Sequence, residues 1–193
     1  MRITSIQIMG ALVAWMAGTA ADAGELQRKV RVDLREWAVV PQEVRTPAKA
    51  MAGRMFAGIG ITLDWGKGEP AGKSWEAPII IELVTETPED RMPGALAYAL
   101  PYEGTHITVF YDRIAKGAYP GTVLAHVMVH EITHLLQGIS RHSETGVMKA
   151  RWTVRDMIGM GMTPLPFTRE DVDLLYLGVA KRPARAGVLV AER

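Results

Sequence analysis

The sequence predicts an α+β domain, with a twisted mixed sheet of about five strands, a buried central helix and a helix near the C-terminus. Three observations lead to this prediction. KVRVDLREW at 29–37 alternates apolar and charged residues, as a half-buried strand does, and PIIIELV at 78–84 is a continuous β-branched run typical of a central strand. Residues 120–138 are apolar on every side, which indicates a fully buried helix.

Three further segments complete the predicted sheet. ITLDW at 61–65 and HITVFYD at 106–112 are short β-rich runs. ALAYAL at 95–100 lies between Gly94 and Pro101, and this suits a short edge strand because a flanking proline is tolerated there. We therefore expect the sheet to present 95–100 at one edge.

Two other segments have the signals of helices. The first runs from Pro47 to Gly58, with Thr46 as its N-cap. The second begins after Thr168, which forms a capping box with Asp171 three residues later. From Pro183 to the end, residues 183–193, we expect a flexible tail.

The first 23 residues have the pattern of a secretory signal peptide. Arg2 precedes an uncharged apolar stretch, and ADA at 21–23 places small residues at the cleavage site. A single membrane anchor is the alternative, but the apolar run is shorter than the roughly 20 residues of a spanning helix. We expect one domain over 24–182, exported to the periplasm or the medium, with no membrane contact after cleavage.

Composition excludes some partners and narrows the choice of metal ligands. The net charge is only +1, so nothing in the charge balance suggests binding to nucleic acid or to an anionic membrane. The chain has no cysteine, which excludes disulfides. Any zinc site must therefore be built from histidine and carboxylate side chains.

The segment HEITH at 130–134 is an HExxH motif on the predicted buried helix. Residues four apart lie one turn apart on one helix face, so His130 and His134 can reach one Zn²⁺ with bonds of roughly 2.0–2.1 Å. Glu131 lies on the adjacent face, where a carboxylate can act as a general base without binding the metal. Two hydrogen-bonded core histidines are the alternative interpretation.

A catalytic zinc needs a third protein ligand. Gly138 permits a sharp helix-ending turn, after which His142 can double back toward the metal. His126, one turn before His130, is interpreted as a residue that supports the ligands or packs in the core. Less favoured ligands are the acidic residues Glu144, Glu170 and Asp171, the last two being better explained as charges at a helix start.

From His130 onward the segment resembles the elongated zinc signature of metzincin metallopeptidases, and TGVM at 145–148 resembles their Met-turn. The resemblance implies a zincin fold with His130, His134 and His142 as ligands and Glu131 as base. It implies Met148 as the methionine below the zinc, and Ser143 after the third histidine is similar to the matrixin branch.

Two departures from this signature are visible. His142 lies eight positions after His134, where the signature has six, so a longer turn must absorb two residues. The tyrosine that some metzincins place two residues after the methionine is replaced by Ala150.

The resemblance implies a zinc endopeptidase in which Glu131 accepts the proton of the attacking water, and the signal-peptide pattern adds that it is secreted. We expect an extended peptide or protein substrate to lie along the edge strand, near Ala95–Leu100. Two alternatives remain. One is a secreted binding module with a structural or vestigial zinc site, and the other is an inert core helix without metal.

Overall fold

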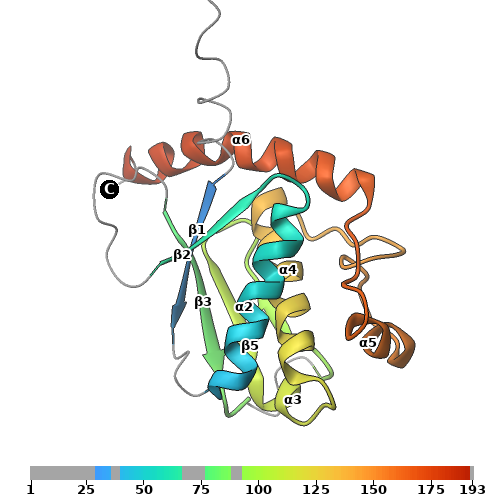
Figure 1. Ribbon diagram of the computed structural model, residues 1–193. Helices are drawn as coiled ribbons and strands as arrows, with labels where there is room; N and C mark the ends of the chain where they lie inside the picture. Colours follow the sequence, from blue (N-terminus) through green and yellow to red (C-terminus); the bar gives the residue numbers. More distant parts are fainter. Residues whose placement is uncertain (1–28, 36–39, 67–76, 88–92, 192–193) are drawn as a thin grey trace, which may run out of the picture.

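The computed structural model describes residues 29–35, 40–66, 77–87 and 93–191 (Figure 1). The expected signal peptide, 1–23, lies outside the described residues, and the domain boundaries stay predictions. No helix in these ranges is both long enough and apolar enough to span a bilayer.

The described strands form one five-stranded mixed sheet in the order β2-β1-β3-β5-β4. All neighbouring pairs are parallel except β4 and β5, which are antiparallel. The predicted mixed sheet is confirmed, including the central place of β3 and the edge position of β4. The bounds are β1 Lys29–Arg35, β2 Thr62–Gly66, β3 Ile79–Val84, β4 Ala97–Ala99 and β5 His106–Phe110.

One face of the sheet is covered by two helices, α2 (Gln42–Ala57) and α4 (Pro120–Gln137), which lie side by side (Figure 1). Alternate strand residues such as Val30, Val32 and Ile81 are buried there, as the period-2 pattern predicts. The core is therefore a two-layer arrangement in which α4 is buried along almost its whole length, as expected.

Helix α2 begins earlier than its sequence signals indicate. Thr46 was expected to cap the helix with Pro47 at its first position, but the helix starts at Gln42 and contains Pro47. The reason is tertiary packing against α4. A Cβ at Gly121 would lie 3.2 Å from the carbonyl oxygen of Val44 and 3.8 Å from Cγ of Pro47, so the two helices pack closely here and outweigh the local cost of the proline.

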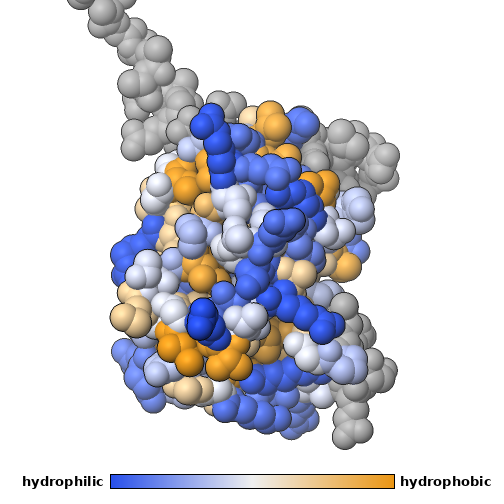
Figure 2. Space-filling view, turned by 90° about the vertical axis from the view of Figure 1, so that its right-hand side faces the viewer, coloured by the Kyte–Doolittle hydropathy of each residue, from blue (hydrophilic) through white to orange (hydrophobic). Residues whose placement is uncertain are grey.

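Two short helices were not predicted, α3 (Tyr111–Ala115) and α5 (Val154–Met160). The end of the predicted strand 106–112 belongs to α3. Helix α5 is nucleated by a capping box between Thr153 and Asp156. Figure 2 shows that apolar residues gather in the lower part of the face toward which α5 projects.

Helix α6 (Arg169–Ala191) crosses one end of the sheet (Figure 1). Its predicted start is confirmed: the amide of Thr168 donates to Oδ2 of Asp171 at 2.9 Å, and the amide of Asp171 donates to Oγ1 of Thr168 at 3.2 Å. The helix continues through Pro183 to Ala191, so it does not end where a tail was expected.

Candidate metal centre

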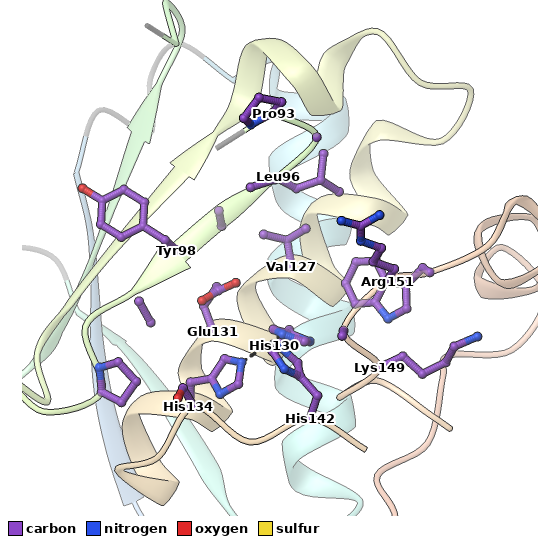
Figure 3. Close-up of a pocket in the computed structure, with 18 of the residues that line it drawn as sticks. Pro93, Leu96, Tyr98, Val127, His130, Glu131, His134, His142, Lys149 and Arg151 are labelled. Carbon is purple, nitrogen blue, oxygen red and sulfur yellow. Dashed lines mark hydrogen bonds between the residues drawn. The ribbon is translucent and has the colours of Figure 1, made fainter. Parts of the chain in front are cut away.

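Helix α4 carries two histidines of the HExxH motif on the face that points into a cleft (Figure 3). His130 and His134 are buried, with 8% and 6% of their surface exposed. Their Nε2 atoms lie 3.0 Å apart, close to the roughly 3.3–3.4 Å that separates two nitrogens bound tetrahedrally to one zinc. The four-residue spacing has therefore brought both nitrogens to one point.

Hydrogen bonds to backbone carbonyls fix the tautomers of both rings. Nδ1 of His130 donates to the carbonyl of Val147 at 2.9 Å, and Nδ1 of His134 donates to the carbonyl of Ile139 at 3.1 Å. A neutral imidazole has only one N–H, so both Nε2 atoms present lone pairs to each other. A cation bound between them satisfies both lone pairs, and this donor arrangement is the one that metal-ligating histidines use.

His142 completes a cluster of three imidazoles. Its ring centroid lies 5.3 Å from that of His130 and 4.9 Å from that of His134. One ligand nitrogen from each of the three rings lies within 4.8 Å of the others, so the cluster could bind a metal ion such as zinc. His142 is exposed, whereas the other two are buried. The sequence predicted that His142 would lie beside His130 and His134.

The turn that returns the chain to the cluster begins at Gly138, as expected. This residue ends α4 with a left-handed φ of 69°, and its amide donates to the carbonyl of His134 at 2.9 Å. The next carbonyl, that of Ile139, accepts the bond from the His134 ring. The turn thus absorbs the longer spacing before His142 and also orients His134.

A buried carboxylate on α6 holds the chain around His142, a role that nothing in the sequence indicated. Asp171 has no exposed surface and accepts hydrogen bonds from Oγ of Ser143 at 2.6 Å and from Nη1 of Arg141 at 2.9 Å. These donors flank His142 directly. Burial raises the pKa of Asp171, but the hydrogen bonds from Ser143, Thr168 and Arg141 outweigh burial and hold the pKa below its usual value.

The turn that contains Met148 lies against the same cluster. Met148 is fully buried, and its carbonyl accepts a hydrogen bond from the amide of Ser143 at 2.8 Å. The carbonyl of the preceding Val147 accepts from the His130 ring and also from Nε1 of Trp152 at 3.3 Å. The turn therefore orients one imidazole of the cluster, and the Met-turn role of Met148 stays a prediction.

His126 lies in the core and is not in the cluster. Its Nδ1 donates to the carbonyl of Thr122 at 2.8 Å, and its Nε2 accepts from the amide of Leu165 at 3.0 Å. Burial lowers its pKa, so the ring is neutral and both nitrogens are used. It contacts Trp152 edge-on at a centroid distance of 6.1 Å, and Trp152 in turn contacts His130 at 5.7 Å. His126 thus supports the centre only through this packing.

Glu131 is buried between the histidines and the edge strand, with 8% of its surface exposed. Burial raises the pKa of its carboxyl group to about 7, and a hydrogen bond from the backbone of Ala99 lowers it. The carboxylate therefore faces the cleft beside the cluster without being one of its three ligands. A group with this pKa can take up and release a proton near neutral pH.

The cleft has a volume of about 770 Å³ and runs between β4 and the chain that follows the Met148 turn (Figure 3). One wall is residues 93–99 with Pro101, and the other includes residues 149–152 with Met157. The three histidines and Glu131 lie between these walls. An extended chain bound along β4 would therefore pass beside the histidine cluster.

Comparison with solved structures shows the fold. The chain is similar to the archaemetzincin of Methanopyrus kandleri, with a TM-score of 0.54 and 12% identity over 78% of this chain and 94% of that one. The fold is archaemetzincin-like. For the archaemetzincin of Archaeoglobus fulgidus complexed with malonate, the TM-score is 0.46 and the identity 14%, over 76% of this chain and 99% of that one. For myroilysin, the TM-score is 0.36 and the identity 15%, over 76% of this chain and 66% of that one. No protein-family model and no curated protein matches the sequence.

Replacing Asp171 with asparagine is expected to destabilise the domain by about 2–4 kcal/mol and to weaken metal binding by about 10–100-fold, because the amide NH₂ would face buried donors. Denaturant unfolding and competition with a chromophoric chelator measure the two effects. The control is Glu170→Gln, since Glu170 bonds the same Arg141 from the surface with 67% of its side chain exposed. Equal losses in both variants would contradict the role of Asp171.

The metal-free protein is expected to lose stability as the pH falls from about 6.5 to 4. Burial lowers the pKa of His130 and of His134 to about 4, so in this window the unfolded chain binds up to two more protons than the folded chain at these positions. Glu131, with its raised pKa, binds a proton in the folded state and partly offsets this. Urea unfolding of Glu131→Gln should therefore show a steeper pH dependence than wild type, and a shallower one would contradict these assignments.

Proposed function

We propose that the chain is a zinc-dependent endopeptidase. The observation that carries this proposal is the convergence of three imidazoles, two of them with their Nδ1 hydrogens committed to carbonyls, beside a buried carboxylate in an open cleft. Three neutral histidine ligands are the donor set of catalytic zinc sites that keep an open position. The archaemetzincin-like fold supports the same conclusion.

The site assigns separate tasks to its residues. His130, His134 and His142 would hold the zinc, with Asp171 and the carbonyls of Val147 and Ile139 fixing their positions. When bound, zinc supplies an acidified water and polarises the substrate carbonyl. Glu131 accepts the proton of the attacking water on its carboxylate and passes it to the leaving amine.

Strand β4 is the proposed docking edge for the substrate. Tyr98 pairs with Thr108 of β5, and the alternation of an antiparallel ladder turns the backbone groups of Ala97 and Ala99 toward the cleft. The bond between Ala99 and Glu131 agrees with this direction. A peptide added to this edge would present its carbonyl beside the histidine cluster.

We extend the proposal to the metzincin subtype of the protein and to its location in the cell. Ser143, the matrixin-like residue after the third histidine, donates to Asp171, so a role in bracing His142 supports a matrixin-like arrangement. We propose that the protein is exported after removal of residues 1–23. Amino-terminal sequencing of the protein from periplasmic and medium fractions tests this, with Gly24 as the expected first residue.

Digestion of a peptide library by the zinc-loaded protein, with mass spectrometry of the products, tests the activity. Cleavage should disappear after chelation and return with zinc. Peptides with proline at positions that pair with β4 should resist cleavage, since proline cannot donate to the ladder. A folded protein that holds one zinc and cleaves nothing in the library would favour the binding module, and a protein that binds no zinc would exclude both.

A further inference from the structure

Arg151 carries a positive charge into the cleft without a partner among the described carboxylates. Its side chain is exposed and lines the cleft on the wall opposite β4. Figure 3 shows its guanidinium directed toward the end of the cleft that Leu96 and Val127 line. Within the described ranges, no aspartate or glutamate forms a salt bridge with it.

The acidic groups nearby in sequence or in the cleft already have other partners. Asp156 accepts from Nζ of Lys149 at 2.6 Å and from the amide and hydroxyl of Thr153 at 2.7 and 2.8 Å. Glu131, the only acid among the described residues that line the cleft, is buried and bonded to Ala99. Among the described residues, no carboxylate therefore occupies the cationic end of the cleft, which can receive one from a substrate.

Arg151 lies across the cleft from β4, and the level of β4 that it faces determines which substrate residue it can contact. Ala99, which bonds Glu131, marks the level of the reacting atoms, and Leu96 lies about 10 Å further along at 3.3–3.4 Å per residue. A substrate antiparallel to β4 runs from Ala99 toward Leu96 in its own N-to-C direction. The third residue after the scissile bond then lies opposite Leu96, at the end of the cleft toward which Arg151 is directed.

We propose that Arg151 makes the enzyme selective for peptides with an aspartate or glutamate side chain at the third position after the scissile bond. The inference rests on the proposed function and adds the substrate class. A guanidinium binds a carboxylate through two parallel hydrogen bonds, a geometry that a neutral amide cannot match. The apolar side chains of Leu96, Val127 and Trp152 line the same cleft and offer no competing charge to the bound carboxylate.

Matched peptides test the proposal. Two peptides differ only in having glutamate or glutamine at the proposed position, and both have an amidated C-terminus. A third peptide has glutamine at this position and a free C-terminal carboxylate. Wild type should cleave the glutamate peptide with a kcat/KM about tenfold above that of the glutamine peptide. Arg151→Gln should bring this ratio close to 1, and Arg151→Glu should favour a lysine peptide over the glutamate peptide.

The control variant is Arg155→Gln, which removes an equal charge from an exposed residue of α5 that does not line the cleft. It should keep the wild-type ratio. The proposal is overturned if wild type does not distinguish glutamate from glutamine, or if Arg151→Gln still does. A preference for the free C-terminus with none for glutamate also overturns it, because the recognised group would then be a terminal carboxylate.

Binding by a zinc-loaded Glu131→Gln protein separates this inference from the peptidase activity. Fluorescence anisotropy with labelled, uncleaved peptides should show tighter binding of the glutamate peptide, and adding Arg151→Gln should abolish the difference. If that holds and wild type cleaves nothing, the selectivity stands and the peptidase proposal fails. If wild type cleaves both peptides equally, the peptidase stands and the selectivity fails. No binding of the glutamate peptide rejects the selectivity.

Discussion

Replacement of Glu131 by glutamine is expected to lower kcat by about 10²–10⁴-fold while the protein keeps its fold and its metal. Glutamine has the same volume and retains an oxygen that can accept the Ala99 hydrogen bond, but it cannot take up a proton. Burial already disfavours the ionised carboxylate, so the variant should be as stable as wild type or more stable. Peptide turnover, metal content and thermal unfolding of the two proteins measure these outcomes.

The control for this variant is Glu144→Gln, which removes an exposed acid near the cluster that is not part of it. It should change neither kcat nor zinc affinity, and a loss of zinc there would revive Glu144 as a ligand. The pH profile gives a second readout. Activity requires the ionised carboxylate, so it should fall as the pH drops through the pKa of Glu131, at or below about 7 because a bound cation lowers it. Turnover by Glu131→Gln within tenfold of wild type would reject the base assignment.

The parts of the site that the sequence predicted are those set by local geometry. The spacing of His130 and His134 depends only on helix rise, and Gly138 only on the left-handed turn that glycine permits. Likewise, the alternation in 29–35 and the β-branched run in 79–84 identified strands that the sheet confirms. Each of these signals acts over a few residues.

The features that the sequence missed depend on contacts between distant segments. Asp171 lies 28 residues from Ser143, and its local pattern explained it fully as a helix cap, so nothing pointed to the link with His142. Helix α2 begins before Pro47 because it packs on Gly121, far along the chain. Arg151 follows the Met148 turn directly, but only the fold shows that its side chain reaches the cleft.

The same long-range packing leads to the largest expected loss of stability, in Gly178→Ala. A Cβ at Gly178 would lie 1.7 Å from the carbonyl oxygen of Leu136, so α6 and the end of α4 meet backbone to backbone. Alanine favours a helix over glycine by about 1 kcal/mol, yet the overlap forces the helices apart, and we expect a net loss of about 3 kcal/mol or more.

This variant should also weaken zinc binding, since α4 carries His134 two residues before the contact and α6 carries Asp171, which braces His142. Gly159→Ala is the matched control: it lies inside α5 with open space around its Cβ position, and it should gain about 0.5–1 kcal/mol. Denaturant unfolding and chelator competition on both variants measure the effects. Unchanged stability in Gly178→Ala would mean that α6 does not pack on α4 as described. Lost stability with unchanged zinc affinity would mean that the centre does not depend on α6.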